Sequence, residues 1–216
     1  MADPILAVSE LRFRYPRTTE ELFDGLTHEF TPGAVTALTG PSGCGKSTLL
    51  YVLGLLLTPS AGSVLIDGED ASRLSDALRS KLRARRIGFV FQDSELDPSR
   101  KVIDSVIEPG LYAGLTREEC LPRAQELLER FGLSARARHR PGQVSGGQAQ
   151  RLAACRALLN HPDIVLADEP TGNLDRGNAE LMLAALVETA HVDGNTVIIA
   201  THDPFVLEHV DEVLQL

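Results

Sequence analysis

The stretch GPSGCGKST, residues 40–48, constrains the fold of this chain more than any other feature. It fits the pattern G-x-x-x-x-G-K-[ST] and lies between a strand-like run, residues 34–40, and helix-forming residues that begin after residue 45. The glycines let the backbone curl so that successive N–H groups point at one phosphate, and the positive end of the helix dipole strengthens this attraction. The stretch therefore predicts a strand–loop–helix unit that binds nucleotide phosphates.

The polar residues of this loop have separate roles. Lys46 supplies a mobile positive charge for the β- and γ-phosphates, and Ser47 offers a hydroxyl to Mg²⁺. At average residue usage a chance match occurs in about one chain in a hundred of this length, so a plain glycine-rich turn is a poor alternative. The predicted nucleotide-binding residues of the loop are Gly40, Pro41, Ser42, Gly43, Cys44, Gly45, Lys46, Ser47 and Thr48.

A second stretch, DIVLADEP at residues 163–170, places two carboxylates directly after a run of apolar residues. Ligands of open α/β sheets bind at the carboxyl ends of the strands. Asp168 is therefore placed to hold Mg²⁺, and Glu169 to polarise an attacking water in line with the γ-phosphate. Two adjacent acids can also be the start of a loop, but a phosphate-binding loop in the same chain favours the catalytic interpretation.

Gln92 and His202 also end strand-like runs, IGFVFQ at 87–92 and TVIIAT at 196–201. The amide of Gln92 can bind Mg²⁺ or a water, and His202 can contact a γ-phosphate or orient Glu169. Each alone would be an ordinary polar residue at a strand end. We predict Lys46, Gln92, Glu169 and His202 as catalytic residues because of the motifs around them.

A third stretch, VSGGQAQR at residues 144–151, places a serine and two glycines at the start of a second helix. One nucleotide does not need two helix N-termini so far apart in sequence. We therefore expect Ser145, Gly146, Gly147 and Gln148 to face the γ-phosphate of a nucleotide held by a second copy of the chain. In that arrangement, the glycines allow the partner's ligand to approach closely.

Strand-like runs alternate with helical ones at both ends of the chain, which indicates an α/β fold with a mainly parallel sheet. Residues 93–160 are mostly helical in character, and Thr116 and Glu119 form a capping box before one of these helices. A helix is also expected at 75–86, with Leu74, Leu78 and Leu82 on one stripe. We predict one domain, residues 1–216, with a catalytic core at about 1–92 and 161–216 and a helical subdomain at about 93–160.

Composition excludes several classes of protein. The net charge of −9 argues against a general nucleic-acid binder, and the longest apolar run, residues 49–57, is too short to cross a membrane. The N-terminal MADPILAVSE has no basic region, so no signal peptide is expected, and three widely spaced cysteines fit a reducing cytoplasm. One basic cluster is expected to be the solvated face and last turn of a helix: Arg79, Lys81, Arg83, Arg85 and Arg86.

The order of these motifs resembles the nucleotide-binding domain of ABC transporters over essentially the whole chain. Walker A (40–48), the glutamine loop (Gln92), the signature (144–148), Walker B (164–169), the D-loop (173–175) and the switch His202 occur in the family's order and spacing. The resemblance implies a P-loop NTPase of ABC type, with an N-terminal antiparallel β section and a helical subdomain. It also implies that Asp175 belongs to the nucleotide site and that Tyr15 stacks on adenine, an ordinary strand aromatic being the alternative.

The resemblance further implies an ATPase that uses ATP and Mg²⁺ and works as a head-to-tail homodimer beneath integral membrane permease subunits. It would lie at the cytoplasmic face of the membrane without inserting into it and would bind no nucleic acid. FVFQ and ADEPTGNLD resemble the branch of macrolide exporters, lipoprotein-releasing systems and the cell-division system. Val144, Cys44, the segment 93–106 and the end at EVLQL without a closing DG hairpin depart from the usual pattern, the last being typical of a minimal or shortened domain.

Two other functions and one smaller hypothesis remain open at this point. The same ATPase cycle could regulate cell-wall remodelling without moving a substrate. A third class, the ABC proteins of translation or DNA repair, is disfavoured because the chain has a single signature and no sustained heptad between Gln92 and Ser145. Cys44 could be a reactive thiol near a helix N-terminus, or a small residue that merely fits the loop.

Overall fold

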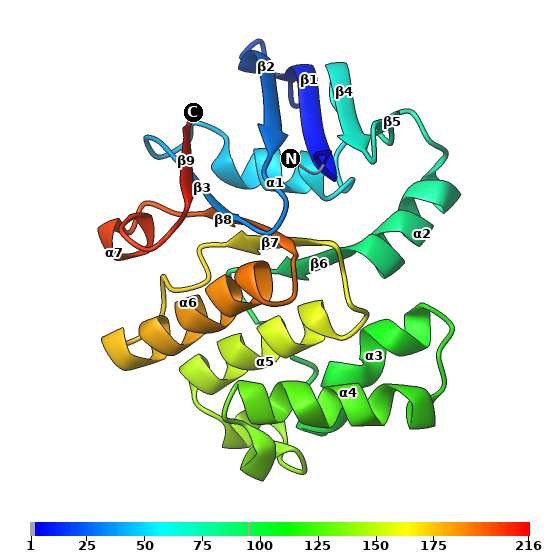
Figure 1. The fold of residues 1–216 in the computed structure, drawn as a ribbon, viewed down its shortest axis with the longest axis vertical. Coiled ribbons are helices and arrows are strands. Elements are labelled where there is room, and N and C mark those ends of the chain that lie inside the picture. The colour runs from blue at the N-terminus through cyan, green and yellow to red at the C-terminus, as the bar shows by residue number, and fades with distance from the viewer. Residues whose placement is uncertain (1–2, 95) are drawn as a thin grey trace.

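A five-stranded parallel sheet forms the centre of the computed structural model, which describes residues 3–94 and 96–216 (Figure 1). Its strand order is β6-β7-β8-β3-β9, and every neighbouring pair is parallel. The predicted parallel sheet is therefore confirmed. The strands are β3 (Val35–Thr39), β6 (Ile87–Val90), β7 (Ile164–Asp168), β8 (Thr196–Ala200) and β9 (Glu212–Gln215).

A four-stranded antiparallel sheet lies beside it, as expected for the N-terminal section, in the order β2-β1-β4-β5. Its strands are β1 (Leu6–Phe13), β2 (Leu22–Phe30), β4 (Ala61–Ile66) and β5 (Glu69–Asp70). The sequence pattern did not identify β2 as a strand. Phe23, Asp24 and Gly25 all have positive φ there, and the register with β1 shifts, so the alternation that marks a strand is broken.

Alternate residues of the central strands face two separate cores, one on each side of the parallel sheet. Ile164 and Leu166 of β7 pack with α1 (Lys46–Leu53) and the antiparallel sheet, so that α1 lies between the two sheets. Val165 and Ala167 pack on the opposite side against helices. Those helices are α3 (Val102–Tyr112), α4 (Arg117–Arg130), α5 (Gly146–Leu158) and α6 (Arg176–His191).

The helices of residues 102–158 share this second core with the parallel sheet. The predicted capping box is confirmed: the hydroxyl of Thr116 accepts from the N–H of Glu119, whose carboxylate accepts from the N–H of Thr116. The division into a catalytic core and a helical subdomain near residues 92 and 161 stays a prediction. Within the described ranges, no helix is both long and apolar enough to cross a membrane.

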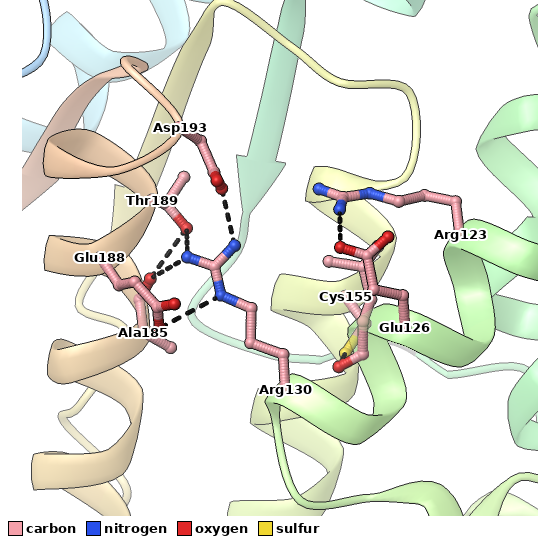
Figure 2. Close-up of polar contacts among 9 residues, drawn as sticks. Arg123, Glu126, Arg130, Cys155, Ala185, Glu188, Thr189 and Asp193 are labelled. Carbon is pink, nitrogen blue, oxygen red and sulfur yellow. Dashed lines mark hydrogen bonds and ion pairs between the residues drawn. The ribbon is translucent and has the colours of Figure 1, made fainter.

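Arg130 ties α4 to the far end of α6 (Figure 2). Its guanidinium donates to the carboxylate of Asp193 at 2.6 Å and to the hydroxyl of Thr189 at 3.2 Å, and its Nε lies 3.4 Å from the carboxylate of Glu188. By contrast, Arg123 on the same helix pairs with Glu126, one turn along α4. The Arg130 side chain is only 14% exposed, so these contacts join the helical section to the core in a partly dry environment.

The remaining elements lie at the edges: α2 (Asp76–Arg86), α7 (Pro204–Leu207) and the short 3-10 turns η1 (Ser134–Arg136) and η2 (Pro141–Gln143). The leucine stripe of α2 makes little contact with the core: Leu82 packs partly buried against it, but Leu78 is 46% exposed and no residue of α2 is fully buried. Arg79 and Arg83 instead donate to the carbonyl of Leu55, just after α1.

Arg86, at the end of α2, pairs with Asp67 and Asp163. The expectation of a solvated basic face therefore holds for Lys81 and Arg85, which are exposed, and is wrong for the three arginines that hold α2 in place. Their long side chains reach back over the apolar surface to acceptors on other elements, which a charge pattern alone does not reveal.

Candidate nucleotide-binding site

The carboxyl ends of four parallel strands meet at one edge of the central sheet. The chain leaves β3 into the glycine-rich loop, and it leaves β6, β7 and β8 just before Gln92, Glu169 and His202. A cavity of about 690 Å³ lies at this edge, and all of its lining residues are among those predicted from the sequence. They are Gly40, Pro41, Ser42, Gly43, Gly45, Lys46, Ser47, Thr48, Gln92, Glu169 and His202.

The loop has the shape of a phosphate cradle. Gly43 and Gly45 have φ values of 83° and 102°, which side-chain-bearing residues rarely adopt. Gly45 is the N-cap of α1, so the unpaired N–H groups and the positive dipole end of α1 begin at the cavity. The ammonium of Lys46 donates to the carbonyls of Gly40 and Pro41, 3.0 and 3.2 Å away, which holds its charge over the loop. This arrangement fits the phosphates of a nucleotide.

The predicted metal ligands Ser47 and Asp168 lie side by side. The hydroxyl of Ser47 donates to Oδ1 of Asp168 at 2.9 Å, and the hydroxyl of Tyr51 donates to Oδ2 at 3.3 Å. Burial raises the pKa of Asp168, although both hydrogen bonds oppose that shift. A hydroxyl and a carboxylate oxygen are ligands that Mg²⁺ prefers, so the pair fits the cation. Gln92 lines the same cavity.

Both carboxylate oxygens of Glu169 are held by residues at the end of β8. Nδ1 of His202 lies 2.7 Å from Oε1, and the hydroxyl of Thr201 donates to Oε2 at 3.3 Å. The N–H of Glu169 also donates to the carbonyl of Ala200, and its backbone has a positive φ of 43°. The carboxylate therefore has a fixed direction at the cavity wall, as a base that positions water requires.

The run IGFVFQ predicted a strand that ends at Gln92. Strand β6 ends at Val90 instead, and Phe91 and Gln92 are exposed. The sequence analysis missed the residue that holds this exit. Gln150 on α5 is 6% exposed, and its amide donates to the carbonyl of Phe91 at 2.9 Å. The available signal was a polar residue on the apolar face of a predicted helix. Tyr51 was also missed, although it lies one helical turn after Ser47.

Five other predicted residues do not line the cavity among the residues that the structure describes: Ser145, Gly146, Gly147, Gln148 and Asp175. Ser145 and Gln148 form a capping box, in which the hydroxyl of Ser145 accepts from the N–H of Gln148 and the amide oxygen of Gln148 accepts from the N–H of Ser145. Asp175 is the N-cap of α6. Within its own chain, each of these residues shapes a helix start.

Tyr15, beside the loop, and Cys44, within it, do not line the cavity. The hydroxyl of Tyr15 is 2.9 Å from that of Thr48, and its ring packs edge-on against Phe13. Stacking of Tyr15 on adenine stays a prediction. Sγ of Cys44 lies 4.0 Å from Nζ of Lys46 and is partly exposed, so a reactive thiol also stays a hypothesis.

Comparison with known proteins agrees with this geometry. The family model described as ABC transporter matches residues 23–172. The lipoprotein-releasing system ATP-binding protein LolD 1 of Rhodospirillum rubrum is 44% identical over 204 residues, which cover 94% of this chain and 90% of that protein.

Two solved structures share the whole fold. The dimeric structure of MJ0796, a bacterial ABC transporter cassette, has a TM-score of 0.89 and 35% identity, covering 98% of this chain and 94% of the other. A post-hydrolysis dimer of the same cassette, bound to ADP and Pi, has a TM-score of 0.88 and 34% identity with the same coverage. The chain described here therefore belongs to the ABC transporter family and has the fold of its ATP-binding cassette.

Proposed function

We propose that this chain is an ATP-hydrolysing subunit that dimerises around two ATP molecules and drives a membrane permease, as an exporter or extractor. The observation that carries the proposal is the position of Glu169. Its carboxylate is oriented by His202 and Thr201 at the wall of a cavity whose floor is the phosphate-binding loop. A fixed base beside a phosphate cradle is what phosphoryl transfer to water needs.

The residues of the cavity have distinct tasks in this reaction. Lys46 and the N-terminus of α1 neutralise the phosphates. Ser47 and Gln92, together with Asp168, which is hydrogen-bonded to Ser47 and does not itself line the cavity, would hold Mg²⁺, and the cation would neutralise charge on the phosphate oxygens. Glu169 accepts hydrogen bonding from the attacking water and takes its proton. His202 keeps Glu169 oriented and, being 77% exposed, can also reach the γ-phosphate.

The proposal of a head-to-tail dimer explains the residues outside the cavity. Ser145 and Gly146 are exposed at the start of α5 and serve no nucleotide in their own chain. A second copy in the opposite orientation would bring its bound ATP to them. The phosphates of that ATP would then lie between the glycine-rich loop of one copy and the N-terminus of α5 of the other. The dimeric structures of the similar cassette, one of them bound to ADP and Pi, support this arrangement.

The membrane partner is inferred from the relatives. LolD 1 is named as the ATP-binding protein of a lipoprotein-releasing system, and the similarity to it covers 94% of this chain. We propose the same branch here, with the subunit attached to integral membrane permease subunits at the cytoplasmic face. Purification of tagged protein from native membranes in mild detergent, with and without ATP, would identify the partner. Recovery of ribosomes or DNA without any membrane protein would contradict this part of the proposal.

The ATPase itself is tested by Glu169→Gln. This variant should keep MgATP affinity, lose about a hundredfold or more in hydrolysis rate, and accumulate as an ATP-bound dimer in size-exclusion chromatography. Lys46→Ala should instead lose MgATP affinity in a nucleotide titration. Glu129→Gln, an exposed change on α4 away from the cavity, is the matched control and should behave as wild type. Full hydrolysis by Glu169→Gln would refute Glu169 as the base.

A further inference from the structure

The two glycines of the segment VSGGQ have different surroundings. A Cβ atom on Gly146 would meet nothing within 4 Å. A Cβ atom on Gly147 would lie 2.8 Å from Cγ of Asn178 and 3.1 Å from both its Nδ2 and Oδ1. A side chain at Gly147 would therefore collide with Asn178 of the same chain, since the first turn of α5 packs directly on the first turn of α6. Of the two glycines, only Gly146 has open space where a side chain would lie.

The amide of Asn178 uses both of its ends. Nδ2 donates to Oδ2 of Asp175 at 2.5 Å, while Oδ1 accepts from the guanidinium of Arg151 at 3.2 Å. The backbone N–H of Asn178 also donates to Oδ1 of Asp175 at 3.0 Å. Arg151 is fixed in turn by its donation to the carbonyl of Phe131, 2.8 Å away. These contacts leave the Asn178 side chain one orientation.

Asn178 thus joins two segments that are far apart in sequence. On one side is the start of α5 with Ser145 and Gly146, and on the other is the turn of residues 173–175 that ends in the N-cap of α6. Backbone and side-chain hydrogen bonds from Asn178 lower the pKa of Asp175, so its carboxylate is ionised as a cap. Both helices start at this junction, where Gly147 of α5 lies against Asn178 of α6.

We propose that Asn178 is a positioning residue that holds the start of α5 and the turn 173–175 as one rigid unit, which each copy of the chain presents to the ATP bound by its partner. The inference rests on the proposed dimer. Neither segment lines its own chain's cavity, so the loss of the Asn178 amide should weaken the association of two ATP-loaded copies while each copy still binds ATP through its own loop.

The test combines Asn178→Ala with Glu169→Gln, so that hydrolysis does not dissolve the dimer. We expect the MgATP affinity of the monomer to stay within about twofold. We expect ATP-dependent dimerisation, measured by light scattering across a protein titration, to weaken by about tenfold, because each copy then has to order the start of α5 and the turn 173–175 when it binds its partner. Leu181→Ala, on α6 and 56% exposed, is the matched control and should dimerise normally. A purely structural role would lower thermal stability and ATP affinity together.

A second-site experiment tests the packing directly. Gly147→Ala alone should weaken dimerisation, because its new methyl group displaces Asn178. The double variant Gly147→Ala with Asn178→Ala should be no worse than Asn178→Ala alone, since the obstructing amide is gone. Additive losses would mean that Gly147 is needed by the partner's ligand and would overturn this assignment.

The outcomes separate the two proposals. If Glu169→Gln alone does not dimerise with MgATP, the proposed function fails and the inference fails with it. If Glu169→Gln dimerises and adding Asn178→Ala changes nothing, the dimer stands and the positioning role of Asn178 is refuted. A reduced monomer affinity for MgATP in Asn178→Ala would likewise refute a role confined to the partner's site.

Discussion

Nδ1 of His202 lies 2.7 Å from Oε1 of Glu169, across the ends of neighbouring strands β7 and β8. The two side chains differ in exposure, 77% for His202 and 16% for Glu169. The carboxylate is thus largely buried and held in one orientation, while most of the imidazole is exposed to solvent. The backbone hydrogen bond between the N–H of Glu169 and the carbonyl of Ala200 fixes the distance between the ends of β7 and β8, and so brings the two side chains together.

His202→Ala should therefore impair hydrolysis more than binding. We expect MgATP affinity to be nearly unchanged, because the loop and Lys46 remain, and the hydrolysis rate to fall by about a hundredfold or more as Glu169 loses its orienting contact. Steady-state ATPase assays with a parallel nucleotide titration would measure both. His209→Ala is the matched control, because the described contacts of that ring are to Phe205, whose carbonyl it bonds and whose ring it packs against. Wild-type turnover by His202→Ala would contradict the assigned role.

The cavity could be predicted from the sequence because its parts are local motifs on a parallel sheet. Once the strands before Gly40, Gln92, Glu169 and His202 are parallel, their ends must meet at one edge. The start of α4 was likewise predicted from the capping box of Thr116 and Glu119. These are cases in which short-range chemistry decides the structure.

What could not be predicted depends on contacts between distant segments. Gln150 reaches Phe91 and Asn178 fills the space beside Gly147, yet neither pair is linked by any sequence pattern. Strand β2 was missed because three consecutive residues of positive φ interrupt its alternation, although it still pairs with β1. Tertiary packing overrides local propensity in each of these places.

The attachment of α2 gives a second prediction. Replacing both Arg79 and Arg83 with methionine leaves the buried Leu55 without the two donors that its carbonyl now has. We expect the free energy of unfolding to fall by about 1–3 kcal/mol, the cost of leaving such a group unpaired. Leu78→Ser, on the same helix and 46% exposed, should change it by less than about 0.5 kcal/mol. Urea denaturation of the two variants would decide which face holds α2. A larger loss of unfolding free energy for Leu78→Ser would mean that the leucine stripe holds this helix.

A third prediction concerns the attachment of α4 to α6. Arg130→Met should destabilise the protein by about 1–2 kcal/mol, because Asp193, Glu188 and Thr189 lose a shared and largely buried donor, while water can reach the two carboxylates that remain. Arg123→Met removes an arginine of the same helix whose ion pair with Glu126 stays within one turn, so it should cost less than about 1 kcal/mol. The two are drawn together in Figure 2. Equal losses in thermal or urea unfolding would mean that the contacts to α6 add nothing.

The last prediction concerns pH and the anchoring of β9. Burial opposes ionisation of Asp211, but the N–H of Val35, 2.8 Å from its Oδ2, and the ring of His191 outweigh burial and lower the pKa of this carboxyl. A carboxyl with a folded pKa below its unfolded value stabilises the fold above the unfolded pKa, about 3.9 for aspartate, and this contribution disappears as the pH falls through the folded pKa.

Asp211→Asn removes this ionisation while keeping the size of the side chain. Wild type should be more stable than Asp211→Asn at pH 7, by less than about 1 kcal/mol because the side chain is partly exposed, and the difference should shrink toward zero below about pH 4. Asp24→Asn, whose side chain is fully exposed, is the control and should show a much smaller change with pH. Urea denaturation of the three proteins between pH 7 and pH 3 would measure the effect. A difference that grows between pH 5 and pH 3 would mean that the folded state raises rather than lowers the pKa of Asp211.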